Sequence, residues 1–177
     1  MLNIKTMALD QCAAINEIDA SQYIGRAWRD VDGARQLVDI NYFAPTWPNG
    51  LDTHYNNLRA TILENGEALG AYDSSGKLLG FATVNRMNFG KTATFALLDQ
   101  LFVTKEMRGK GIGKQLFLKA TEIARKFGAE HLFICAGSAE ETIAFYHALG
   151  CVDAIERHEG FYESDPRDFQ LTYKLSL

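Results

Sequence analysis

The stretch Arg108-Gly-Lys-Gly-Ile-Gly-Lys114 decides how this chain folds and what it can bind. It follows an apolar, strand-like run at 95–103 and opens a helical pattern at 112–127. A strand, a glycine-rich turn and a helix N-terminus together present free backbone amides to an anion. Basic residues are normally unfavourable at a helix N-terminus, because the helix dipole is positive there. A cluster of them at this helix start therefore indicates a bound anion. The stretch therefore predicts a site for a phosphate-bearing ligand, with four cations nearby: Lys105, Arg108, Lys110 and Lys114.

Two widespread phosphate-binding motifs do not fit this stretch. A P-loop would need glycine where Arg108 stands and serine or threonine where Gln115 stands. A dinucleotide fingerprint would need glycine at Lys114 and a position in an early strand–helix–strand unit. What remains is the pattern R-x-x-G-x-G, formed by Arg108, Gly111 and Gly113.

The rest of the chain predicts a mixed α/β sheet with at least one parallel pair. Apolar residues at helical spacing, with Gly or Asn-Gly at several ends, predict helices at 8–18, 51–63, 112–127 and 139–149. Apolar runs rich in β-branched and aromatic residues predict strands at 68–72, 77–84, 93–103, 131–136, 152–157 and 169–175. Residues 19–49 mix aromatic, charged and turn residues, and we expect an irregular segment there with room for short helices.

Composition narrows the function classes. A length of 177 residues predicts one domain over 1–177, and a net charge of −4 argues against non-specific nucleic-acid binding. No apolar run is long enough to span a membrane and no signal peptide is visible, so we expect no membrane partner. The cysteines are odd in number and form no CxxC pair, which favours reduced thiols and a cytoplasmic location. The histidines show no ligand spacing, and we expect no metal.

Two motifs resemble the GNAT family of N-acetyltransferases. The stretch Leu101–Leu116 is similar to that family's acetyl-CoA-binding motif, and Thr142–Cys151 is similar to its following A-x-x-F-Y-x-x-x-G-F helix. The resemblance implies a GNAT-like α/β fold: a mostly antiparallel sheet flanked by helices, with a parallel pair that splays between residues 102 and 134. It implies a CoA-binding core at about 66–158. The variable N-terminal part, 1–65, carries no such signature.

The resemblance also implies how acetyl-CoA, the co-substrate, would be held. Arg108 and the loop amides would bind the CoA pyrophosphate. These amides belong to Gly109, Lys110, Gly111, Ile112, Gly113 and Lys114. The backbone of Leu101, Phe102 and Val103 would pair with the pantetheine arm as an extra strand would.

Two residues are candidates for the chemistry. Tyr146 matches the family's tyrosine general acid near the CoA sulfur, but it also continues an apolar helical stripe and is open to a packing role. Asp99 stands where many members carry an acidic base or amine-binding group, and a structural hydrogen bond is the alternative. The motif departs from the family at Ala139, often asparagine, and at Cys151, often phenylalanine.

These observations predict an acetyl-CoA-dependent N-acetyltransferase that transfers acetyl directly to a primary amine of a small molecule or peptide. The alternatives are a non-catalytic acyl-CoA-binding module and an antibiotic-modifying acetyltransferase. Cys135 and Cys151 have no evident histidine partner, so we do not expect a covalent thiol intermediate. Dimers are common in the family, which makes a homodimer a candidate assembly.

Overall fold

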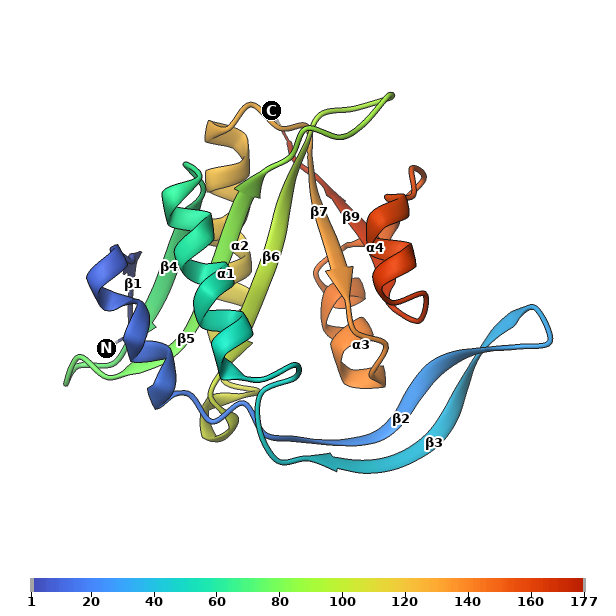
Figure 1. The fold of residues 1–177 in the computed structure, drawn as a ribbon, viewed down its shortest axis with the longest axis horizontal. Helices are drawn as coiled ribbons and strands as arrows, with labels where there is room; N and C mark the ends of the chain where they lie inside the picture. Colours follow the sequence, from blue (N-terminus) through green and yellow to red (C-terminus); the bar gives the residue numbers. More distant parts are fainter. Residues whose placement is uncertain (1, 177) are drawn as a thin grey trace.

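The computed structural model describes residues 2–176 and arranges nine strands in two sheets (Figure 1). The large sheet has the order β1-β4-β5-β6-β7-β9-β8, and β2 and β3 form a separate hairpin. Only β6 and β7 pair in parallel among these strands, which confirms the predicted fold class. The strands are β1 Asn3–Thr6, β2 Gln22–Val31, β3 Ala34–Ala44, β4 Glu67–Tyr72, β5 Leu78–Arg86, β6 Phe95–Val103, β7 His131–Ala136, β8 Val152–Asp153 and β9 Phe169–Lys174.

Helices cover both faces of the large sheet. The α-helices are α1 Leu51–Leu63, α2 Ile112–Lys126, α3 Glu140–Ala148 and α4 Glu159–Ser164, and two 3-10 helices lie at η1 Leu9–Glu17 and η2 Lys105–Met107. Ala96 and Leu98 of β6 share a core cluster with residues of α2 and α3, whereas Phe95 and Leu97 pack toward Phe161 of α4. Helix α1 and η1 cover the sheet next to α4, on the face opposite α2 and α3 (Figure 1).

The apolar stripe of α2 builds the main core. Ile112, Leu116, Ala120 and Ala124 are all buried, as their helical spacing predicts. Their side chains meet the alternate residues of β5 and β6 that face α2. This packing fixes the start of α2, and with it the glycine loop, at the end of β6.

The prediction for residues 19–49 is wrong, because most of this segment forms the β2–β3 hairpin. Its two-residue turn is Asp32-Gly33, with φ of 52° and 80°, and Asp-Gly is a strong hairpin signal. The strands on either side of this turn give no such signal. Most of their side chains are partly or fully exposed, so no apolar–polar alternation marks a buried face.

Smaller differences occur at both ends of the chain. The element at 8–18 is the 3-10 helix η1, and the strand expected at 152–157 is only the two-residue β8. The polar loop expected before the last strand contains the short helix α4. No helix among residues 2–176 is long and apolar enough to cross a membrane.

Candidate active site

The parallel strands β6 and β7 pair over only four residues and then diverge. Their last pair is Leu98 with Ile134, although β6 continues to Val103 (Figure 1). The predicted splay is therefore observed, and it begins at this pair rather than at residue 102. Beyond Leu98, the edge of β6 that faces β7 has no strand partner among residues 2–176.

A β-bulge lies at the point of divergence. On the other side of β6, Gln100 pairs with Thr83 and Leu98 pairs with Val84, which leaves Asp99 as the extra residue. A bulge re-aims side chains and disrupts the ladder, and such irregularities are common beside active sites. It shifts the alternation of β6, so that Phe102 packs beside α1 while Leu101 packs against the α2 face.

The glycine loop presents six amides without backbone partners. Gly109 and Gly111 have φ of 75° and 83°, a region that L side chains rarely adopt, and Gly111 is the N-cap of α2. In the chain from 2 to 176, no amide of residues 109–114 donates to a backbone carbonyl, and the first bond is from the Gln115 N–H to the Gly111 carbonyl. These amides and the helix dipole form an anion site of the predicted kind.

Gly113 has a different role, in packing. A Cβ on this residue would lie 3.3 Å from the ring of Phe145 on α3. The missing side chain therefore allows α2 and α3 to approach beside the glycine loop.

Arg108 points toward carbonyls. Its guanidinium donates to the carbonyl oxygens of Val103 at 3.0 Å, Ser21 at 2.8 Å and Asp19 at 3.2 Å. Desolvation lowers the pKa of Arg108. The side chain thus ties the segment before β2 to the end of β6, and its role on phosphate stays a prediction.

The segment from Asp19 into β2 connects the ends of the two diverging strands. At β6, the Asp19 N–H donates to Thr104 Oγ1 at 2.9 Å. At β7, the Trp28 N–H donates to the Ser138 carbonyl at 2.9 Å, and Arg26 forms an ion pair with Glu140 at the start of α3. Sequence reasoning missed this connection, because no local pattern shows that distant segments will meet.

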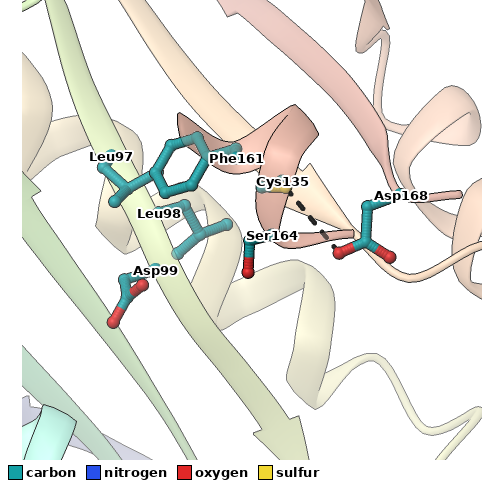
Figure 2. A pocket seen from close by; sticks show the side chains of 7 residues that line it. All are labelled: Leu97, Leu98, Asp99, Cys135, Phe161, Ser164 and Asp168. Atoms are coloured by element: carbon teal, nitrogen blue, oxygen red, sulfur yellow. Dashed lines mark hydrogen bonds between the residues drawn. The ribbon is translucent and has the colours of Figure 1, made fainter. Parts of the chain in front are cut away.

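Asp99 lines a cavity of about 170 Å³ between β6, β7 and α4 (Figure 2). The lining residues are Leu97, Leu98, Asp99, Cys135, Phe161, Ser164 and Asp168. Burial raises the pKa of Asp99, and the neighbouring His54 opposes that shift. A carboxylate with a raised pKa and access to a cavity suits a base or an amine-binding group.

Asp168 is a second carboxylate in the same cavity, and the sequence reasoning did not identify it. Burial, followed by the nearby Asp165, raises the pKa of Asp168 to about 6. Its side chain accepts a weak hydrogen bond from the Cys135 thiol at 3.8 Å. It follows α4 in a loop without a motif, so nothing in the local sequence marks it.

Tyr146 is buried in the core between α2 and α3. Its ring lies 6.3 Å from that of Phe117 and 5.1 Å from that of Phe145. Burial raises the pKa of the Tyr146 hydroxyl above its usual value, which keeps the proton on it. The cavity lining includes Asp99 but not Tyr146, so the structure does not bring the two candidates together in one pocket.

The thiols are poor nucleophiles. Burial raises the pKa of Cys135 and of Cys151 to about 12, so thiolate is scarce at neutral pH. No group of three or more His, Cys, Asp or Glu side chains that could hold a metal occurs in the part of the chain that the structure describes.

The comparison with protein-family models gives a clear result. Residues 34–151, two thirds of the chain, match the model of the acetyltransferase (GNAT) family. This chain belongs to the GNAT acetyltransferase family. The match includes β6, the glycine loop and the Tyr146 helix, and the family assignment agrees with the splayed parallel pair.

Solved structures of acetyltransferases share the fold. A nourseothricin acetyltransferase is 22% identical with a TM-score of 0.75, covering 99% of both chains. The PaiA N-acetyltransferase from Thermoplasma acidophilum, solved with coenzyme A, is 17% identical with a TM-score of 0.64, covering 98% of this chain and 99% of that one. The ribosomal-protein-S18-alanine N-acetyltransferase from Escherichia coli is 16% identical with a TM-score of 0.64, covering 100% and 96%. A search of curated proteins found no match.

Proposed function

We propose that this GNAT protein binds acetyl-CoA in the divergence of β6 and β7 and transfers the acetyl group directly to a primary amine. One observation carries the proposal: six free amides stand at the end of the strand whose edge is unpaired. An unpaired strand edge that is followed by an anion site suits a ligand that has a pyrophosphate and an amide-bearing arm.

The donor half of this site uses mainly backbone. The amides of 109–114, aided by Lys110 and Lys114, would bind the pyrophosphate. The unpaired edge at Leu101, Phe102 and Val103 would hydrogen-bond the pantetheine arm. Bound acetyl-CoA supplies an activated acetyl thioester.

The acceptor half would lie on the α4 side of β6, at the cavity next to Asp99. Asp99 would take a proton from the acceptor ammonium, so that the neutral amine can form a bond to the thioester carbonyl carbon. The carbon–sulfur bond then breaks, and the Tyr146 hydroxyl would donate its proton to the departing thiolate. The second proton leaves the product nitrogen, which becomes a neutral amide, and restores the Tyr146 hydroxyl. The raised pKa of Asp99 makes this carboxylate a stronger base, and the raised pKa of Tyr146 keeps the hydroxyl protonated until the thiolate departs.

The test combines binding and turnover. Calorimetry with CoA should show saturable binding, and incubation with acetyl-CoA and a library of primary amines should release free thiol with at least one of them. Tight CoA binding with no thiol release on any amine would favour a non-catalytic acyl-CoA-binding module. No CoA binding at all would overturn the proposal.

A second candidate is an antibiotic-modifying acetyltransferase. Two carboxylates and no cationic side chain line the cavity, which suits a polycationic acceptor. The similarity to a nourseothricin acetyltransferase over nearly the full length of both chains supports the same candidate. Expression in a sensitive bacterium should raise the inhibitory concentration of nourseothricin, and an unchanged concentration would reject this candidate.

The cysteines support a proposal about the compartment. Cys12, Cys135 and Cys151 are all free, and a reducing cytoplasm is where free thiols persist. Localisation of a tagged protein by cell fractionation tests this assignment.

A further inference from the structure

Asp168 stands across the cavity from Asp99. Asp99 comes from the bulge of β6, whereas Asp168 comes from the loop between α4 and β9. In Figure 2 they lie on opposite sides of Ser164, at the end of α4. Two acidic side chains from distant segments therefore border one small space, whose other lining is largely apolar.

Within residues 2–176, no cation forms an ion pair with Asp168. The nearest arginine in sequence, Arg167, pairs with Asp165 at 2.8 Å and acts on Asp168 through its charge alone, which lowers the pKa of Asp168 less than the Cys135 hydrogen bond does. An adjoining cavity that Asp168 also borders contains Arg35 and Arg157. These two arginines are engaged elsewhere, with Asp153 at 3.8 Å and Glu159 at 3.0 Å.

The one hydrogen bond that the Asp168 side chain makes with the described residues is also weak. A thiol is a poor hydrogen-bond donor, and the Cys135 Sγ lies 3.8 Å from Asp168 Oδ2. A half-buried carboxylate without a strong hydrogen-bond donor or a cation destabilises the folded protein when the carboxylate is ionised. A structural role would instead place such a carboxylate on backbone amides, as Asp73 is placed on those of Ser75 and Lys77.

We propose that Asp168 is a specificity-determining residue for acceptors that carry two ammonium groups. It binds the second ammonium group while the first reaches Asp99. Leu97 and Phe161 supply apolar wall for the methylene chain between the two charges. This inference rests on the proposed function, because it assigns the acceptor subsite of the same active site.

The test compares matched acceptors in the full-length protein. Acetylation is measured with linear α,ω-diamines of two to five carbons and with the monoamines of the same chain lengths. The wild type should prefer at least one diamine through a lower KM. Asp168→Asn should reduce that preference about tenfold, with the loss in KM rather than in kcat.

Glu163→Gln is the matched control. Glu163 is exposed on α4, does not line the cavity and forms no ion pair in the described residues, so the variant removes the same charge near the same loop. It should keep the wild-type preference. A wild type without diamine preference, or an equal loss in both variants, would overturn the inference.

Direct binding separates this inference from the proposed function. Calorimetry with 1,4-diaminobutane and n-butylamine, in the presence of CoA, needs no turnover. Diamine binding that Asp168→Asn weakens about tenfold supports the role of Asp168 even if no acetylation occurs, in which case only the proposed function falls. Equal diamine affinity in wild type and Asp168→Asn overturns the inference even if other amines are acetylated.

Discussion

The donor half of the site and the acceptor half are built from different kinds of atoms. The donor half consists mainly of backbone: free amides at 109–114 and the unpaired edge of β6. The acceptor half consists of side chains from β6, β7, α4 and the loop before β9. Backbone sites require glycine and a fixed order of elements, whereas side-chain sites only require that distant residues meet.

This difference explains what can change in each half. A backbone site tolerates many side chains but few changes in backbone geometry. A side-chain site can be altered by single substitutions on a loop without disturbing the sheet. The acceptor half is therefore where members of one family can differ in substrate while they share a donor.

The largest expected effect comes from the glycine loop. Gly111→Asp places a side chain at φ 83° and a negative charge among the six amides, so the CoA affinity should fall about 10³-fold, which is about 4 kcal/mol. Gly128→Asp is the control. Gly128 follows the C-terminal end of α2, has a similar φ of 78°, and leaves open space where a Cβ would stand. Calorimetry should show normal CoA affinity for that control. Equal losses in both variants would point to general strain rather than to a phosphate site.

Asp99 tests the acceptor half directly. Asp99→Asn should lower kcat about 10²-fold or more without weakening CoA binding, because the base is lost while the donor half stays intact. In the wild type, kcat/KM should fall as the pH drops through the raised pKa of Asp99, since protonation removes the base. The charge of the nearby His54 works against this rise in the pKa of Asp99. A pH profile that is identical in wild type and Asp99→Asn would return Asp99 to a structural role.

Tyr146 tests the proposed proton donor, which lies in the core beside α2 rather than in the lining of the cavity. Tyr146→Phe should lower kcat about 10²-fold while the CoA affinity changes little, since only the proton donor is removed. Tyr173→Phe is a matched control, because the Tyr173 ring also packs against Phe117. Full activity in Tyr146→Phe would leave the residue with packing alone.

The same contrast explains which features could be predicted from the sequence. The glycine loop and α2 can be predicted from local patterns, because turn geometry and helical periodicity depend on residues that are close together in the sequence. The β2–β3 hairpin was missed, since its strands are largely exposed and Asp32-Gly33 was the one clear signal. Asp168 was missed for another reason: its importance depends on Asp99 and Cys135, which are distant in the chain.

Arg108 separates a phosphate ligand from a structural link. Its three hydrogen bonds to carbonyls predict that Arg108→Ala lowers the free energy of unfolding by about 2 kcal/mol, with CoA affinity changing only a few-fold. Urea denaturation and calorimetry measure the two quantities. Arg125→Ala, which removes one bond to the Ser176 carbonyl and a long one of 3.4 Å to Thr121 Oγ1, should cost less stability. A large loss of CoA affinity without a loss of stability would restore the phosphate role.

The smallest effect concerns Asp168 in the protein without substrate. Its folded-state pKa of about 6 lies above the unfolded value of about 3.9, so its protonated form favours folding at low pH and this contribution is lost as the pH rises through 6. The groups that set this pKa are Cys135 on β7 and Asp165 and Arg167 on its own loop, while Asp99 faces it across the cavity. Asp168→Asn should therefore stabilise the protein by about 1 kcal/mol at pH 7.5, after allowance for solvent screening, and by almost nothing at pH 4.5.

Urea denaturation at the two pH values measures this difference, with Glu163→Gln as the exposed control. Residues that bind a ligand often lower the stability of the empty protein, so stability and specificity can be measured against each other at this carboxylate. A stabilising Asp168→Asn variant that has also lost diamine preference would show that the acceptor half trades stability for specificity at one side chain. A destabilised variant would instead make Asp168 a structural residue like Arg108, and the acceptor half would then depend on Asp99 alone.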